Sequence, residues 1–181
     1  MKKTFLLLAA YFYLRSMKLF GIVAIGIILS GALSSCQKSK EYPIEPEIDM
    51  STRQVYHNPA KIIITFTDGD GDIGFHESDT LPPFNFVDDG NGNSENKYYY
   101  NLLLYYFEKN DGVWEEIETL VPYSYRVPYI TPTGQNKALN GEIEVDIVLS
   151  GARPDSIRFE IELIDRALHE SNRLVTPVIY R

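Results

Sequence analysis

The 181-residue chain contains one cysteine, Cys36, so it can form no disulfide within itself. Its stability must therefore come from a hydrophobic core, with a bound ion as a further source. Histidine is almost as scarce. The three histidines, His57, His76 and His169, lack the spacing of zinc ligands, which argues against zinc or another transition metal.

Basic residues are few outside the N-terminus. The net charge is −8, and the first 35 residues carry four basic residues and no acidic one, which leaves −12 for residues 36–181. A protein that binds nucleic acid needs a basic face, so this composition argues against a nucleic-acid partner. It suits a domain that attracts cations.

The sequence signatures of common enzymes are missing. There is no G-x-S-x-G, no H-E-x-x-H, no P-loop and no Rossmann fingerprint. The 25 acidic residues offer many carboxylate pairs of the kind that hydrolyse glycosides, and no pair stands out. We therefore expect a protein that is not an enzyme. An envelope hydrolase that acts on glycans through loop carboxylates is the alternative.

Two hydrophobic runs near the N-terminus are too short for a membrane helix. Phe5–Leu14 and Leu19–Leu33 are separated by polar and basic residues, and neither reaches the roughly 20 residues that a span requires. The second run follows a lysine and ends in small residues, which is typical of a secretory signal. Residues 1–35 are therefore predicted to be a signal peptide, and translation from Met17 would give a leader of ordinary length.

The leader ends in "LSSC", from Leu33 to Cys36. This segment resembles the lipobox of bacterial lipoproteins. The resemblance implies that Cys36 is acylated with palmitate or a similar chain, becomes the mature N-terminus and holds the protein on a membrane. Gln37 resembles the sorting signal of outer-membrane lipoproteins, and both the periplasmic and the surface face remain open. A free thiol at the end of an uncleaved anchor is the alternative.

The rest of the chain shows strand patterns and turn residues, with almost no helical periodicity. Residues 36–50 are polar and contain two prolines, which predicts the lipidated cysteine and a tether, and residues 51–181 are the predicted domain. Seven runs are β-branched, aromatic or alternating, as strands are. These runs are Lys61–Thr67, Lys97–Lys109, Val113–Thr119, Tyr123–Ile130, Gly141–Leu149, Ser156–Asp165 and Arg173–Tyr180. They predict an all-β fold, an antiparallel immunoglobulin-like β-sandwich of seven or eight strands, with a small barrel as the alternative.

The segment "ITFTDGDGDIGF", Ile64–Phe75, carries three aspartates directly after a predicted strand. The aspartates are Asp68, Asp70 and Asp72. The glycines between them let the backbone curl, so that the carboxylates can point to one centre. Because calcium takes carboxylate and carbonyl oxygens as ligands, the segment predicts a calcium loop. The alternative is an acidic turn whose carboxylates point apart, since Asp-Gly is also a common turn dipeptide.

The aspartate spacing is similar to that of an EF-hand loop, in which Asp79 would occupy the twelfth position. Ile73 stands where an EF-hand needs glycine, and a strand rather than a helix precedes the loop. We therefore exclude an EF-hand and keep Asp79 as a secondary candidate ligand.

Asp165 ends another predicted strand, Ser156–Asp165. If this strand and Lys61–Thr67 are strands F and B of the sandwich, the loops that follow them lie at the same end. Asp165 would then lie near the three loop aspartates and supply another ligand. Equally, it could accept backbone N–H groups and cap only its own turn.

Two further motifs, "FTDGDGDIG" and "DRALHESN", accompany the lipobox. Together they resemble uncharacterised secreted lipoproteins of bacteroidete type. The second motif matches the D-x-A-G-N-x-S ending of bacterial immunoglobulin-like domains in part, because Leu168 and His169 stand in place of glycine and asparagine. The resemblance implies a β-sandwich lipoprotein of the outer membrane and passes on no activity.

Aromatic residues crowd Lys97–Lys109 and the run that follows it. Tyr98, Tyr100, Tyr106 and Trp114 are candidates for a platform that binds a glycan or a protein partner. The alternative is cross-strand pairing that stabilises the sheet. A role in an outer-membrane protein assembly is also open.

Overall fold

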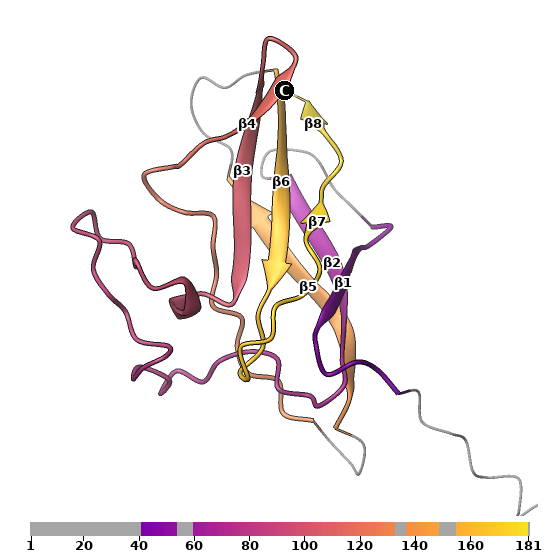
Figure 1. Cartoon of the computed structure of the whole chain (residues 1–181). Helices are drawn as coiled ribbons and strands as arrows, with labels where there is room; N and C mark the ends of the chain where they lie inside the picture. The colour runs from indigo at the N-terminus through magenta and orange to yellow at the C-terminus, as the bar shows by residue number, and fades with distance from the viewer. Residues whose placement is uncertain (1–40, 54–59, 133–136, 149–154, 181) are drawn as a thin grey trace, which may run out of the picture. The chain divides into compact units, whose positions relative to one another are not determined.

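The computed structural model describes residues 41–53, 60–132, 137–148 and 155–180, and Figure 1 shows their arrangement. The signal peptide, Cys36, His57 and Leu149 lie outside this part of the chain. Among the described residues, no helix is long and apolar enough to span a membrane. The elements are β1 (Glu47–Met50), β2 (Ala60–Asp68), η1 (Lys97–Tyr99), β3 (Leu102–Asn110), β4 (Val113–Glu116), β5 (Leu139–Ile147), β6 (Ser156–Leu163), β7 (Leu174–Val175) and β8 (Ile179–Tyr180).

The strands form two antiparallel sheets that pack against each other, which confirms the predicted all-β sandwich (Figure 1). One sheet has the order β1-β2-β5. The other has the order β4-β3-β6-β7, and β8 also pairs with β6. These are the A-B-E and C′-C-F-G orders of immunoglobulin-like sandwiches. In this scheme β2 is strand B and β6 is strand F, as predicted.

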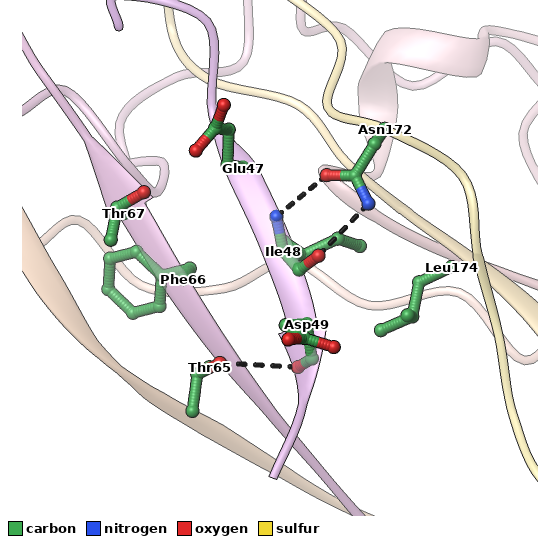
Figure 2. A pocket seen from close by; sticks show the side chains of 8 residues that line it. All are labelled: Glu47, Ile48, Asp49, Thr65, Phe66, Thr67, Asn172 and Leu174. Carbon is green, nitrogen blue, oxygen red and sulfur yellow. Dashed lines mark hydrogen bonds between the residues drawn. The ribbon is translucent and has the colours of Figure 1, made fainter. Parts of the chain in front are cut away.

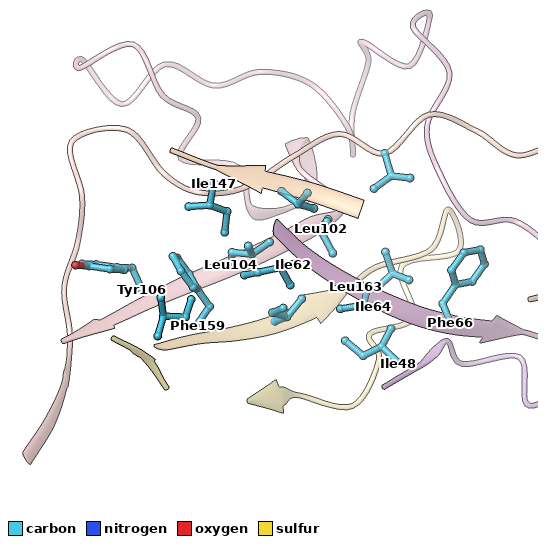
Figure 3. Close-up of a cluster of buried hydrophobic side chains, with 14 of the residues drawn as sticks. Ile48, Ile62, Ile64, Phe66, Leu102, Leu104, Tyr106, Ile147, Phe159 and Leu163 are labelled. Carbon is cyan, nitrogen blue, oxygen red and sulfur yellow. The ribbon is translucent and has the colours of Figure 1, made fainter. Parts of the chain in front are cut away.

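The core lies between the two sheets (Figure 3). It contains every second residue of the facing strands, because successive side chains of a strand point to opposite faces. Val145 and Ile147 in β5 are buried, while their acidic neighbours are exposed. In β6 the buried residues are Ile157, Phe159, Ile161 and Leu163, as the alternating pattern predicts.

The aromatic strand is shorter than the predicted Lys97–Lys109. Its first three residues form the 3₁₀ helix η1, and β3 begins at Leu102. The side chain of Asn96 caps this helix by accepting the Tyr98 N–H at 3.1 Å, and it also donates to two carbonyls of the preceding loop. This capping contact competes with strand pairing, and the aromatic composition alone does not reveal the contact.

The segment predicted as Tyr123–Ile130 does not form a strand. Tyr125 exchanges backbone hydrogen bonds with Leu102, and three residues later Pro128 makes a bridge with Phe75. The segment thus changes its backbone pairing partner within three residues, and Pro128 has no N–H to donate to a strand ladder. Pro177 similarly divides the last predicted strand into β7 and β8.

The predicted tether, residues 36–50, includes residues that belong to the sandwich. Glu47–Met50 forms β1, which pairs with the C-terminal half of β2. The Asn172 amide holds the outer edge of β1, because it accepts the Ile48 N–H at 2.8 Å and donates to the Ile48 carbonyl at 2.9 Å. The sandwich therefore begins before residue 51.

Candidate metal centre

The aspartate loop begins at the last residue of β2, Asp68, which still pairs with Leu139 of β5. The chain then curls through Gly71, whose φ of 75° is in the left-handed region. A Cβ at Gly71 would lie 1.9 Å from the carbonyl oxygen of Lys137, so only glycine fits here. After the curl, Ile73 is fully buried, and its carbonyl accepts the Ile130 N–H at 3.1 Å. The loop is therefore held between two other segments.

Four aspartates meet at this end of the sandwich. Carboxylate oxygens of Asp68, Asp70, Asp72 and Asp165 all lie within 4.8 Å of one another. The loops after β2 and β6 are thus adjacent, as the assignment to strands B and F requires. The alternative of an acidic turn with carboxylates that point apart is wrong.

Two carboxylate oxygens in the cluster are buried without a partner. Asp68 is fully buried, and its Oδ2 accepts the Asp72 N–H at 2.9 Å while its Oδ1 has no hydrogen-bond donor. Asp72 Oδ1 is likewise buried and has no hydrogen-bond donor. Buried polar atoms are nearly always paired, and an unpaired buried charge is costly. A cation held in the cluster would give such atoms a partner.

The electrostatics of the cluster support the same conclusion. The pKa of Asp68 is raised to about 6, mainly by burial and further by the charges of the other three aspartates, against the opposing effect of the Asp72 N–H. Burial, followed by the charge of Asp165, also raises the pKa of Asp72. Two carboxylates about 4 Å apart repel by about 4 kcal/mol at an effective dielectric constant near 20. A cation would convert this repulsion into attraction.

The sequence left two positions open for Asp165, near the loop aspartates or only in its own turn, and the structure shows both. Asp165 belongs to the cluster, and its Oδ1 accepts the His169 N–H at 2.8 Å, which caps the turn after β6. Its Oδ2 lies 2.8 Å from Nδ1 of the His169 ring. This bond, together with the charge of Asp165, raises the pKa of His169. His169 therefore positions Asp165, a role that only the i, i+4 spacing of the two residues could have suggested.

Asp79 is not part of the cluster, so the secondary candidate was wrong. Its carboxylate accepts the His76 N–H at 2.8 Å and forms an ion pair with the guanidinium of Arg166. Arg166 also donates its backbone N–H to the carbonyl oxygen of Asp72 at 3.3 Å. Asp79 thus ties the long loop after β2 to the turn after β6 from outside the site.

The donor set of the cluster fits calcium. All four side chains offer hard carboxylate oxygens, and calcium takes six to eight oxygen ligands from carboxylates, carbonyls and water. No sulfur or imidazole nitrogen belongs to the cluster, although these are the usual zinc ligands. Asp70 is exposed, so the site opens to solvent, from which a cation could enter.

The predicted aromatic platform does not form. Tyr106 is only 7% exposed and packs in the core against Tyr123 and Phe159. Tyr98 lies in η1, and Tyr100 follows this helix, so neither belongs to the strand that carries Tyr106. The four residues therefore share no face.

The outward aromatic rings of the larger sheet are covered by cations. The Arg158 guanidinium lies 4.8 Å from the Trp114 ring and 5.1 Å from the Phe107 ring. The Arg173 guanidinium lies 3.8 Å from the Tyr105 ring. Such cation–π contacts link neighbouring strands, which favours the sheet-stabilising alternative.

A pocket of about 490 Å³ lies along β1 and β2 (Figure 2). Figure 2 shows that the Asn172 amide, which lines it, is directed to the backbone of Ile48. On the same wall, the Thr65 hydroxyl donates to the Asp49 carbonyl at 3.3 Å. These polar groups hold β1 in the sheet, and the pocket is a consequence of strand pairing.

The chain was compared with protein-family models, curated proteins and solved structures, and none of them matches it.

Proposed function

We propose that the protein is a lipid-anchored module of the cell envelope, with a β-sandwich that calcium stabilises and a binding or structural role. The two unpaired buried oxygens, Asp68 Oδ1 and Asp72 Oδ1, carry the calcium proposal. The lipobox-like segment that ends at Cys36 supports the anchor, and Gln37 supports the outer membrane. The partner is a glycan or a protein, and we propose no enzymatic activity.

Calcium would hold the loop after β2 against the turn after β6 through Asp68, Asp70, Asp72 and Asp165. Asp68 ends β2 and Asp165 follows the end of β6, which are central strands of their sheets, while Asp70 and Asp72 lie in the loop after β2. Calcium sites in extracellular modules bind with dissociation constants of about 10⁻⁴–10⁻³ M. At tenfold excess, such a site adds about 1.4 kcal/mol to the free energy of unfolding.

Thermal unfolding of the purified lipidated protein tests the calcium site. We expect the melting temperature to be several degrees higher in calcium than in chelator, because the ion binds the folded chain and not the unfolded chain. The paired substitution Asp70→Ala with Asp72→Ala should abolish the difference.

The control is Glu115→Ala with Glu118→Ala, which removes two exposed acidic side chains away from the cluster. This control should keep the full calcium response. A wild-type protein that melts at the same temperature in calcium and in chelator would refute the calcium site.

A further inference from the structure

The segment that leads from the lipid anchor into the domain lies against the aspartate loop. Glu47, the first residue of β1, pairs with Thr67, next to the end of β2, so the chain enters at the end of the sandwich that carries the cluster (Figure 1). At Gly69, an added Cβ would lie 2.4 Å from the carbonyl oxygens of both Tyr42 and Pro43. The backbone of this segment therefore rests directly on the loop.

The contact is made by the residue between two of the candidate ligands. Gly69 lies between Asp68 and Asp70, so the curl that brings their carboxylates together also shapes the surface under Tyr42 and Pro43. The segment has a second contact, because the Asn140 amide lies 3.5 Å from the Tyr42 hydroxyl. Pro46 is buried at the end of the segment.

We infer that the bound cation controls the length of the tether by clamping residues 42–46 onto the domain. Without the cation, the aspartates repel one another, the loop loses its curl, and the surface under Tyr42 and Pro43 is lost. This inference rests on the proposed function, since it requires both the cation and the lipid on Cys36.

The two states differ in how far the domain can stand from the membrane. With the segment clamped, Cys36 and Tyr42 are six residue-to-residue steps apart, which can span about 20 Å. With the segment released, Cys36 and Glu47 are eleven steps apart, which can span about 36 Å. The cation would therefore hold the domain close to the lipid surface and its loss would extend the reach toward a partner.

Hydrogen exchange of the lipidated protein, in calcium and in chelator, tests the clamp. The readout is the exchange rate of the Tyr42, Ile44 and Glu45 amides. At tenfold calcium excess the open population falls about elevenfold, so these amides should exchange about ten times more slowly in calcium than in chelator. The amides of β4, at the opposite end of the sandwich, should be unaffected by calcium.

The variant Pro43→Gly with Pro46→Gly separates the clamp from the ion. It loosens the segment and leaves the aspartate loop unchanged, so calcium should still raise the melting temperature, while the tether amides should exchange quickly in both conditions. If this variant does not fold, Pro43→Gly alone, at an exposed position, serves the same test. A calcium-dependent melting shift in the wild type without slower exchange at residues 42–46 would overturn the clamp and leave the proposed function intact. The absence of any melting shift would overturn both.

Discussion

Asp68 is the residue on which the candidate site depends most. It is fully buried at the end of a central strand, and one of its two carboxylate oxygens has no donor. A carboxylate in this position destabilises the folded chain unless a cation is bound. Without a cation, Asp68 therefore lowers the free energy of unfolding, and this loss of stability is the physical argument for a ligand.

The pH dependence of stability in chelator should reveal this cost. Asp68 has a folded pKa of about 6 and an ordinary value of 3.8, so the folded chain holds its proton more tightly than the unfolded chain does. The resulting stabilisation is complete below pH 3.8 and is lost as the pH rises to about 6. The shift corresponds to about 3 kcal/mol in the free energy of unfolding.

Asp68→Asn should remove this pH-dependent contribution, which denaturant unfolding between pH 4 and 7 measures. In chelator at pH 7, the variant should be more stable than the wild type, and calcium should stabilise it less. Asp146→Asn, at an exposed position of β5, should keep the wild-type slope. A variant with the same slope as the wild type would contradict the assignment of this pKa to Asp68.

At the scale of elements, the aspartate loop depends on close backbone approach, and the hairpin turn between β3 and β4 does not. Gly71 and Gly112 both have positive φ, 75° and 86°. An added Cβ meets the Lys137 carbonyl at Gly71 and nothing within 4 Å at Gly112. A side chain at Gly112 therefore has only the conformational cost of a positive φ, and a side chain at Gly71 has a steric cost in addition.

Alanine substitution at these two glycines tests the packing of the loop. Gly112→Ala should cost about 1 kcal/mol, because only the left-handed conformation is penalised. Gly71→Ala should cost at least about 3 kcal/mol and should weaken the calcium response, since the loop must move away from Lys137. The measurement is urea unfolding in calcium and in chelator. Equal costs at the two positions would show that the loop is not packed as described.

For the whole molecule, the proposed lipid anchor at Cys36 would decide where the domain works. Cys36→Ser should abolish incorporation of labelled palmitate and shift the protein out of its normal membrane fraction, because serine offers no thiol to acylate. Ser35→Ala keeps a small residue before the cysteine and should be labelled like the wild type. Labelling that persists in Cys36→Ser would exclude this cysteine as the lipidation site, since the chain has no other.

Much of the sandwich could be predicted from local patterns. The alternation in β5 and β6 and the buried run in β2 reveal which face is in the core, because the period of a strand depends only on the chain itself. Because these patterns depend only on neighbouring residues, they do not predict β1. Its four residues, "EIDM", lie in a polar segment with prolines, and they become a strand only because β2 and Asn172 supply partners.

Neighbouring residues by themselves determine some features of this protein, and tertiary contacts determine the others. The alternating aspartates and glycines, the single cysteine and the strand periods are properties of neighbouring residues, and the sequence alone indicates a curled acidic loop on a β-scaffold. Only the tertiary structure shows that Asp165 joins this loop and that His169 holds it. It also shows that Asp79 pairs with Arg166 instead and that Tyr42 and Pro43 cover Gly69. These contacts join residues that are distant in the chain, and they exist because β2 and β6 end on the same side of one core.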